Sequence, residues 1–178
     1  AVIAMLLATA SAAATYEYSV PGDTAGRSLR LNVPASVPVV RGLLIWGNGS
    51  NSDLRGMATD PEMVALAESM GFAVLGTAMW DAFFPGTPNE YTAFDAGLSQ
   101  LATASGHPEI RTVPWLPVGH SNGGCMSYGL NTLQLARTIA MAANEGRGYN
   151  DTRPIAAALG TPGLLLAGGA DTAERRTN

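Results

Sequence analysis

The sequence has 178 residues, of which 47% are hydrophobic and 13% are charged, and its formal net charge is -4. A chain of this length and apolar content can bury one substantial core, and the small number of charges excludes a disordered, solvating chain. Every basic residue is an arginine and these are scattered along the chain, so the basic stripe that nucleic-acid binding requires is absent and no nucleic-acid partner is expected.

The first fourteen residues have the composition of a secretory signal peptide. Residues 2–7 form a short apolar run, and residues 8–14 are small residues in which several A-x-A cleavage sites overlap. The run is shorter than the roughly 20 apolar residues that span a bilayer, so no stable membrane anchor is expected. We predict a partial signal peptide over residues 1–14, and therefore a secreted or periplasmic protein. A buried first helix or strand is the alternative.

The rest of the chain alternates between strand and helix patterns. Residues 16–20 and 29–33 predict an antiparallel pair of strands joined by the turn at residues 21–23. The following segments predict a parallel sheet with helices on both faces, within one domain over residues 15–178. In chain order they are strand 39–46, helix 61–70, strand 72–77, helix 91–104, strand 113–118, helix 122–133, strand 138–143 and strand 164–167.

The segment Gly119-His120-Ser121-Asn122-Gly123 carries the clearest sign of chemistry. A sharp turn from the strand before it into the helix after it would hold the serine hydroxyl above the sheet, with a strained backbone. The residues two positions away on either side must be very small because the backbones cross there, and both are glycine. The helix would point its positive end at the serine, which places the Asn122 amide to donate to an oxyanion. We predict that Ser121 is a catalytic nucleophile; an ordinary glycine-rich turn is the alternative.

A second glycine-rich loop ends the first expected parallel strand, at residues 46–51. Small residues let a backbone approach a bound carbonyl group closely. The loop resembles the His-Gly loop of many lipases, with Asn48-Gly49 where His-Gly would stand, and this alignment implies that the Ser50 amide is the second donor to an oxyanion. A plain glycine turn is the alternative.

The acid and the base of a catalytic triad differ in how clearly they can be assigned. An apolar strand and several small residues lead to Asp171, the predicted acid that would orient an imidazole. Asp151 is a weaker candidate, and a helix-capping role for Asp171 is the alternative. No histidine follows Asp171: His107 is expected at the opposite edge of the sheet from Ser121, and His120 is expected to leave the turn in another direction. We expect a fragment whose catalytic histidine lies outside the sequence.

Aromatic residues gather in the loop after the second expected parallel strand. Trp80, Phe83 and Phe84, together with Trp46, are predicted to line an apolar acyl or aromatic subsite, because this loop lies on the same edge as the serine. Packing beneath the loop is an equal alternative. No metal or organic cofactor is predicted, and the single cysteine, Cys125, is expected in the core.

These motifs make the sequence resemble the α/β-hydrolase superfamily, on the side of the secreted esterases. Residues 119–126 are similar to the elbow of dienelactone-hydrolase-like, polyhydroxybutyrate-depolymerase-like and feruloyl-esterase-like enzymes, and residues 162–171 to the acid segment of cutinase-like polyester hydrolases. The resemblance implies an α/β-hydrolase fold, truncated before its last strand and helix. It also implies a Ser-His-Asp mechanism in which Ser121 forms an acyl-enzyme with a small or polymeric ester.

Two other functions stay open at this point. A peptidase, thioesterase or acyltransferase would share the fold and the nucleophile, and a noncatalytic binding protein would share only the fold. A histidine in a loop after one more strand of the full-length gene would favour catalysis.

Overall fold

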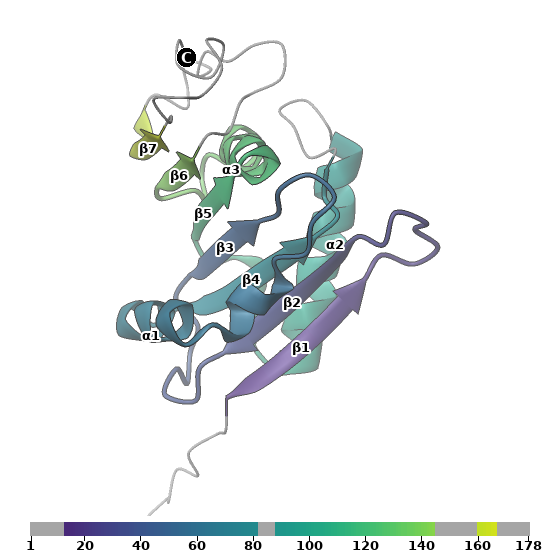
Figure 1. Cartoon of the computed structure of the whole chain (residues 1–178). Coiled ribbons are helices and arrows are strands. Elements are labelled where there is room, and N and C mark those ends of the chain that lie inside the picture. The colour runs from purple at the N-terminus through teal and green to yellow at the C-terminus, as the bar shows by residue number, and fades with distance from the viewer. Residues whose placement is uncertain (1–12, 82–87, 145–159, 167–178) are drawn as a thin grey trace, which may run out of the picture.

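The structure is a computed structural model that describes residues 13–81, 88–144 and 160–166. Figure 1 shows a twisted sheet with helices on both of its faces. The strands are β1 (Ala14–Ser19), β2 (Ser28–Val33), β3 (Leu43–Gly47), β4 (Ala73–Ala78), β5 (Trp115–His120), β6 (Met141–Asn144) and β7 (Gly163–Leu166). The helices are α1 (Pro61–Met70), α2 (Pro88–Ser105) and α3 (Asn122–Leu133), with the short 3-10 helices η1 (Arg55–Thr59) and η2 (Pro108–Arg111).

In the part of the chain that the structure describes, the strands form one sheet in the order β1-β2-β4-β3-β5-β6-β7. The pairs β1–β2 and β2–β4 are antiparallel, and the strands from β4 through β7 run parallel to one another. The predicted antiparallel opening and parallel body of the sheet are confirmed. Because parallel strands end at one common edge, the loops after β3, β4 and β5 lie together there.

Most predicted elements are present, and the largest difference lies before β3. The expected strand over residues 39–46 begins only at Leu43. The backbone of Val40 donates instead to the Glu109 carboxylate at 2.9 Å, and that of Arg41 to the carbonyl of Gly71 at 2.8 Å. The apolar run starts earlier than the strand because Val40, although outside the sheet, is 1% exposed and packs in the core.

Helix α1 agrees with the predicted helix residue for residue, because both of its ends have strong local signals. The Asp60 carboxylate accepts hydrogen bonds from the amides of Glu62 and Met63, at 3.0 and 3.1 Å. Gly71 has a φ of 70°, the left-handed conformation that ends many helices. Helix α3 also matches its predicted range, residues 122–133.

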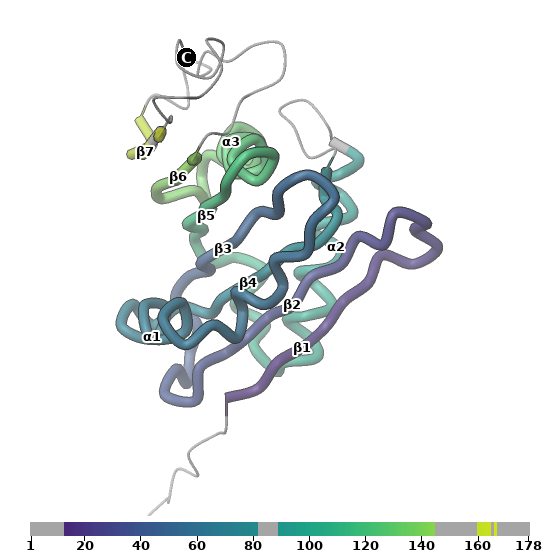
Figure 2. The backbone as a smooth tube through the Cα atoms, in the orientation of Figure 1, coloured from purple at the N-terminus to yellow at the C-terminus, as the bar shows by residue number. Residues whose placement is uncertain are grey.

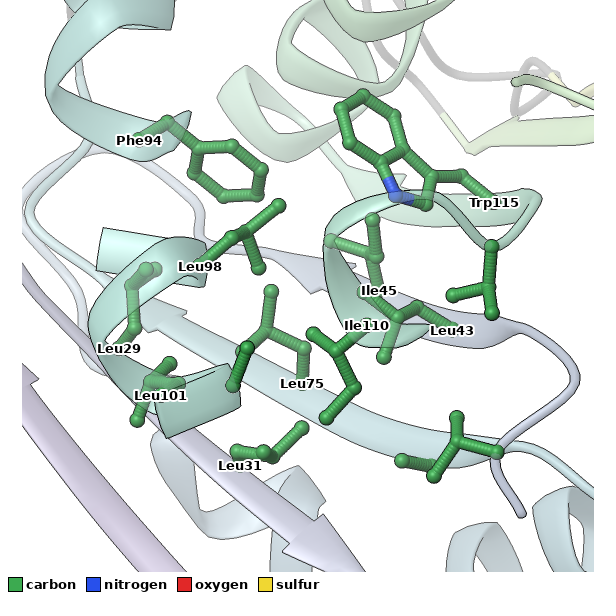
Figure 3. Packing of buried hydrophobic residues seen from close by; sticks show 14 of the residues in the cluster. Leu29, Leu31, Leu43, Ile45, Leu75, Phe94, Leu98, Leu101, Ile110 and Trp115 are labelled. Atoms are coloured by element: carbon green, nitrogen blue, oxygen red, sulfur yellow. The ribbon is translucent and has the colours of Figure 1, made fainter. Parts of the chain in front are cut away.

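The two faces of the sheet have separate apolar clusters. The larger cluster fills the space between the sheet and helices α2 and α3, and Figure 3 shows its leucines, isoleucines and aromatic rings in contact. The smaller cluster lies under α1 on the other face. Strand β3 serves both, since Leu43 and Ile45 point to the larger cluster and Leu44 to the smaller.

The predicted signal peptide lies almost entirely outside the described residues, since the structure is described from residue 13 onward. No helix in the described ranges combines the length and the apolar character needed to cross a membrane.

Candidate active site

The segment that carries Ser121 is a sharp turn between β5 and α3. Ser121 has φ 56° and ψ -122°, a conformation that residues with a Cβ rarely adopt and that costs about 1–3 kcal/mol. Its amide donates to the carbonyl of Asn144 at the end of β6, at 2.9 Å. The strained turn predicted from the sequence is therefore present, and the neighbouring strand holds it in place.

Three glycines make the turn possible. A Cβ on Gly119 would lie 2.1 Å from the carbonyl oxygen of Gly123, and a Cβ on Gly123 would lie 2.1 Å from that of Gly47. Gly119 and Gly123 were expected to be needed for this crossing. Gly47 was not, because it belongs to β3, whose pairing with β5 places it opposite Gly119. Only the register of the sheet shows that the start of α3 lies against both β3 and β5.

Strained backbone is concentrated at this edge of the sheet. Within the described ranges, the non-glycine residues with positive φ are Asn51, Met79 and Ser121. They follow β3, β4 and β5 respectively, so all three lie at the carboxyl ends of neighbouring parallel strands. Such outliers persist only where the surroundings hold them, and they are frequent at functional sites.

The loop after β3 turns back over the end of the sheet and leads into η1, as Figure 2 shows. The carbonyl of Gly49 points into this loop, where it accepts from the amide and hydroxyl of Ser52 at 3.2 and 2.8 Å and from Nδ2 of Asn48 at 2.8 Å. Because the peptide bond is trans, the N–H of Ser50 points the opposite way. No acceptor for this N–H is found among the described residues.

The start of α3 offers a second set of amides. The amides of Asn122 and Gly123 have no acceptor in the described ranges, as expected for the first turn of a helix. A Cβ on Gly49 would lie 3.9 Å from the carbonyl oxygen of His120, so the loop after β3 runs beside this turn. The N–H of Ser50 and the N–H of Asn122 therefore belong to adjoining segments at one edge of the sheet.

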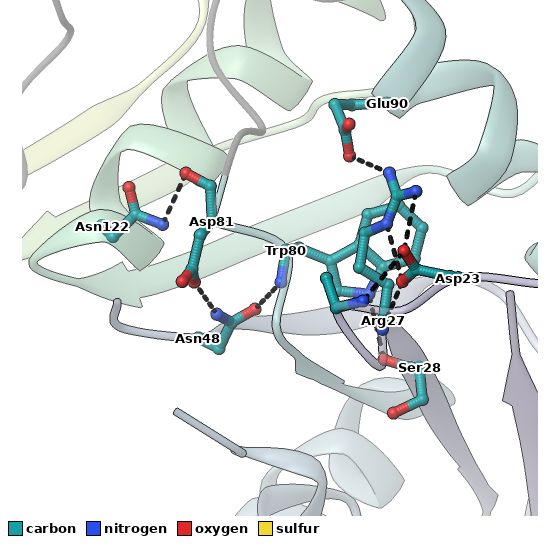
Figure 4. Close-up of polar contacts among 9 residues, drawn as sticks. Asp23, Arg27, Ser28, Asn48, Trp80, Asp81, Glu90 and Asn122 are labelled. Atoms are coloured by element: carbon teal, nitrogen blue, oxygen red, sulfur yellow. Dashed lines mark hydrogen bonds and ion pairs between the residues drawn. The ribbon is translucent and has the colours of Figure 1, made fainter. Parts of the chain in front are cut away.

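A buried asparagine organises the loop after β3. Asn48 has no exposed surface, and its amide donates to the hydroxyl of Thr77 at 2.9 Å. Its Oδ1 accepts from the Trp80 amide and from the Thr77 hydroxyl, each at 3.0 Å. Its Nδ2 donates to Gly49 and to the carboxylate of Asp81 at 3.0 Å. Figure 4 shows the contacts of Asn48 with Trp80 and Asp81, which give both its side-chain oxygen and its side-chain nitrogen a partner.

Asp81 joins this loop to the turn that carries Ser121. Its carboxylate accepts from Nδ2 of Asn48 and from the amide of Asn51, and its carbonyl accepts from Nδ2 of Asn122 at 3.2 Å. The sequence pattern does not single out this residue, because the aromatic side chains of the same loop carry the stronger signal. Its position could have indicated a role, because it is a carboxylate just after a strand that ends at the same edge of the sheet as Ser121.

Comparisons with known proteins agree with this architecture. No family model and no curated protein matches the sequence. Among solved structures, an acetyl xylan esterase from Aspergillus awamori is similar, with TM-score 0.51 and 13% identity over 79% of this chain and 56% of that chain. An α/β hydrolase enzyme from a Medee basin deep-sea metagenome library has TM-score 0.50 and 15% identity over 86% of this chain and 64% of that one.

The chain has an α/β-hydrolase fold. At these identities the similarity establishes the fold alone. The chain spans 56% and 64% of the length of the two solved chains.

The substrate-binding prediction for Trp80 is wrong. In this α/β-hydrolase fold its side chain has no exposed surface, its ring packs edge-on against Phe94 at 5.6 Å, and its Nε1 donates to the carbonyl of Ser28. The positive φ of Met79 turns the chain at the end of β4 and directs Trp80 into the core. Trp46 packs against the smaller cluster on the α1 face, so its observed contacts are also packing contacts.

The other predicted site residues lie outside the described residues. They are Phe83, Phe84 and Asp171, and so is the weaker acid candidate, Asp151.

His107 lies at the edge of the sheet that the sequence predicts for it. His107 immediately precedes η2 and β5, at the edge of the sheet opposite Ser121, and its Nδ1 lies 2.9 Å from the Glu109 carboxylate. Partial burial acts to raise the pKa of Glu109, but hydrogen bonds from His107 and the Val40 amide lower it below its usual value. His120 is the exposed last residue of β5.

Among the described residues, the remaining chemistry-bearing groups offer no second centre. Cys125 is 2% exposed in α3, which agrees with its expected place in the core. In the described ranges, no group of three or more histidine, cysteine or acidic residues could hold a metal ion.

Proposed function

We propose that this chain carries the nucleophile and the oxyanion hole of a serine hydrolase that cleaves carboxylic esters. The observation that carries the proposal is the strained backbone of Ser121 at the N-terminus of α3. Beside it, the N–H groups of Ser50 and Asn122 have no acceptor among the described residues. Two solved structures of similar fold, one named an acetyl xylan esterase and the other an α/β hydrolase enzyme, support the proposal at the level of the fold.

In the proposed reaction, Oγ of Ser121 attacks the carbonyl carbon of an ester. The negative charge that develops on the carbonyl oxygen is stabilised by the N–H groups of Ser50 and Asn122, and by the positive end of α3. Loss of the alcohol leaves an acyl-enzyme, which water hydrolyses to release the acid. The substrate is a small ester or a polyester, with Phe83 and Phe84 as proposed contacts.

The reaction also needs a base that takes the proton of Ser121 and an acid that orients this base. Neither His107, at the far edge of the sheet, nor His120, within the turn itself, is suited to the role. The proposal therefore includes a histidine contributed from outside the 178 residues, with Asp171 as the acid. Residues 1–14 support export of the protein by a signal peptide.

The test is an esterase assay on the gene product expressed from its complete reading frame. We expect hydrolysis of p-nitrophenyl esters of varied chain length, loss of at least about 10³-fold in kcat for Ser121→Ala, and unchanged activity for the control Ser69→Ala. Ser69 lies in the last turn of α1, which leads into the start of β4 at the edge of the sheet opposite Ser121, and its hydroxyl donates to the carbonyl of Leu66. If wild type and Ser121→Ala are equally inactive on every ester, the proposal fails. Cleavage of p-nitroanilides in place of esters would instead identify a peptidase.

A further inference from the structure

We propose that Asp81 is a positioning residue that holds the loop after β3 against the Ser121 turn, so that the N–H groups of Ser50 and Asn122 face one oxyanion. This inference rests on the proposed function and adds a residue to it.

The two carboxylate oxygens of Asp81 hold two different parts of the loop. Oδ1 accepts from Nδ2 of Asn48 at 3.0 Å, and Oδ2 accepts from the amide of Asn51 at 2.7 Å. The amides of Gly49 and Ser50 lie between these two anchors along the chain, and neither has an acceptor in the described ranges; that of Ser50 is the proposed donor. Asp81 therefore fixes the loop on both sides of the donor while leaving the donor itself available.

The contact with Asn48 also sets the direction in which the donor points. One Nδ2 hydrogen of Asn48 goes to Asp81 and the other goes to the Gly49 carbonyl at 2.8 Å. Fixing this carbonyl fixes the peptide plane between Gly49 and Ser50, because the peptide bond is planar. The N–H of Ser50 is thereby held on the opposite side of that plane. Such preorganised donors need no rearrangement when charge develops on the substrate.

Asp81 reaches the second donor through its own backbone. Its carbonyl accepts from Nδ2 of Asn122 at 3.2 Å, and Asn122 is the first residue of α3. Asp81 is itself fixed, because the preceding residue, Trp80, is fully buried and donates to Ser28 and to Asn48. The core thus supports a residue that contacts both sides of the proposed oxyanion hole, as Figure 4 shows.

The chemistry of the two donors favours a carboxylate at position 81. Both the Asn48 side chain and the Asn51 amide present hydrogens, so both groups need an acceptor. An asparagine at position 81 would offer one acceptor oxygen and would turn an NH2 group toward the other donor. The substitution Asp81→Asn keeps the size of the side chain and is therefore the sharpest test.

The first measurement does not depend on esterase activity. Amide hydrogen exchange is followed residue by residue in wild type, Asp81→Asn and the matched control Asp60→Asn, which keeps a good N-cap on α1. We expect exchange at Asn51 to become at least about tenfold faster in Asp81→Asn and to stay unchanged in the control. Unchanged protection at Asn51 in Asp81→Asn would overturn the proposal.

The second measurement uses the complete gene product and p-nitrophenyl acetate. We expect Asp81→Asn to lower kcat at least about tenfold with KM changed by less than about threefold, because the contact matters mainly in the transition state. The pH profile should keep its shape, since the base is not involved, and Asp81→Ala should be at least as impaired. A change in KM alone, or wild-type kcat, would overturn the positioning role. If wild type shows no hydrolysis that depends on Ser121, the proposed function fails, while exchange at Asn51 still decides whether Asp81 holds the loop.

Discussion

Ser121 shows how much local strain one residue can hold when its neighbours are tied down. Its amide donates a hydrogen bond to the carbonyl of Asn144, and α3 begins with the next residue. The turn is therefore fixed from both sides, and the serine cannot relax to an ordinary conformation. The strain holds the side chain at the edge of the sheet, and it reduces the free energy of unfolding.

This strain gives the first prediction. Replacing Ser121 with glycine removes the Cβ that makes φ 56° costly, whereas replacing it with alanine keeps that Cβ. Relief of about 1–3 kcal/mol, less about 0.5–1 kcal/mol for the added chain entropy of glycine, should make Ser121→Gly more stable than Ser121→Ala. Urea unfolding of the two variants measures the difference. A glycine variant less stable than the alanine variant would show that the turn is unstrained.

The crossing of Gly47, Gly119 and Gly123 gives the second prediction. Alanine at Gly123 would gain about 1 kcal/mol from helix propensity, but its Cβ would lie 2.1 Å from the Gly47 carbonyl oxygen, which no backbone tolerates. We expect Gly123→Ala to lower the free energy of unfolding by at least about 1–3 kcal/mol, because strand β3 must move. Gly56→Ala is the control, since a Cβ there meets nothing within 4 Å. Equal stability of the two variants in urea would contradict the crossing.

At the scale of the element, α1 shows how much a helix cap contributes to the free energy of unfolding. Its N-terminal amides are satisfied by one carboxylate, that of Asp60. We expect Asp60→Ala to lower the free energy of unfolding by about 0.5–2 kcal/mol and Asp60→Asn to leave it nearly unchanged, because asparagine caps equally well. Chemical denaturation of both variants measures this. Equal losses in the two variants would mean that the charge, and not the hydrogen bonds, stabilises the helix.

Trp80 acts at the same scale, because it joins three elements. It follows β4, packs against Phe94 of α2 and donates to Ser28 of β2. We expect Trp80→Phe to lower the free energy of unfolding by about 1–3 kcal/mol through the lost volume and hydrogen bond. Thermal or urea unfolding checks this, and wild-type stability would show that Trp80 is not part of the core.

At the scale of the whole molecule, ion pairs between carboxylates and nearby arginines make the stability of the fold depend on pH. Hydrogen bonds from Arg27 lower the pKa of Asp23, and those from Arg55 lower the pKa of Asp53. A pKa that is lower in the folded state than the ordinary value of 3.8 stabilises the fold above that pH. This stabilisation is lost as the pH falls through the lower, folded-state pKa.

We therefore expect the urea midpoint of the wild type to fall between about pH 5 and about pH 2, and to fall less steeply in a variant carrying both Asp23→Asn and Asp53→Asn. The two variant side chains cannot take up a proton in this range, so their part of the acid sensitivity disappears. If the urea midpoint falls equally steeply with pH in wild type and variant, the two aspartates do not contribute to the acid sensitivity.

Much of this architecture could be predicted from the sequence by itself. Strand and helix periods and the glycines around Ser121 predicted the order of the elements and the site of the turn. These signals are local, because each depends on residues within one or two turns of the chain. The same locality explains the error before β3, where the apolar residue Val40 packs in the core from a loop.

Only the tertiary structure decided which residues meet at the active edge. Gly47 is needed because β3 pairs with β5, and Asp81 holds the loop after β3 because β4 ends beside it. Trp80, expected at the substrate, is buried because the chain turns inward at Met79. The sequence alone determined that Ser121 stands on a strand-to-helix turn. The contacts that hold the neighbouring loops around Ser121 come from residues distant in the sequence, and a local sequence pattern cannot predict such contacts.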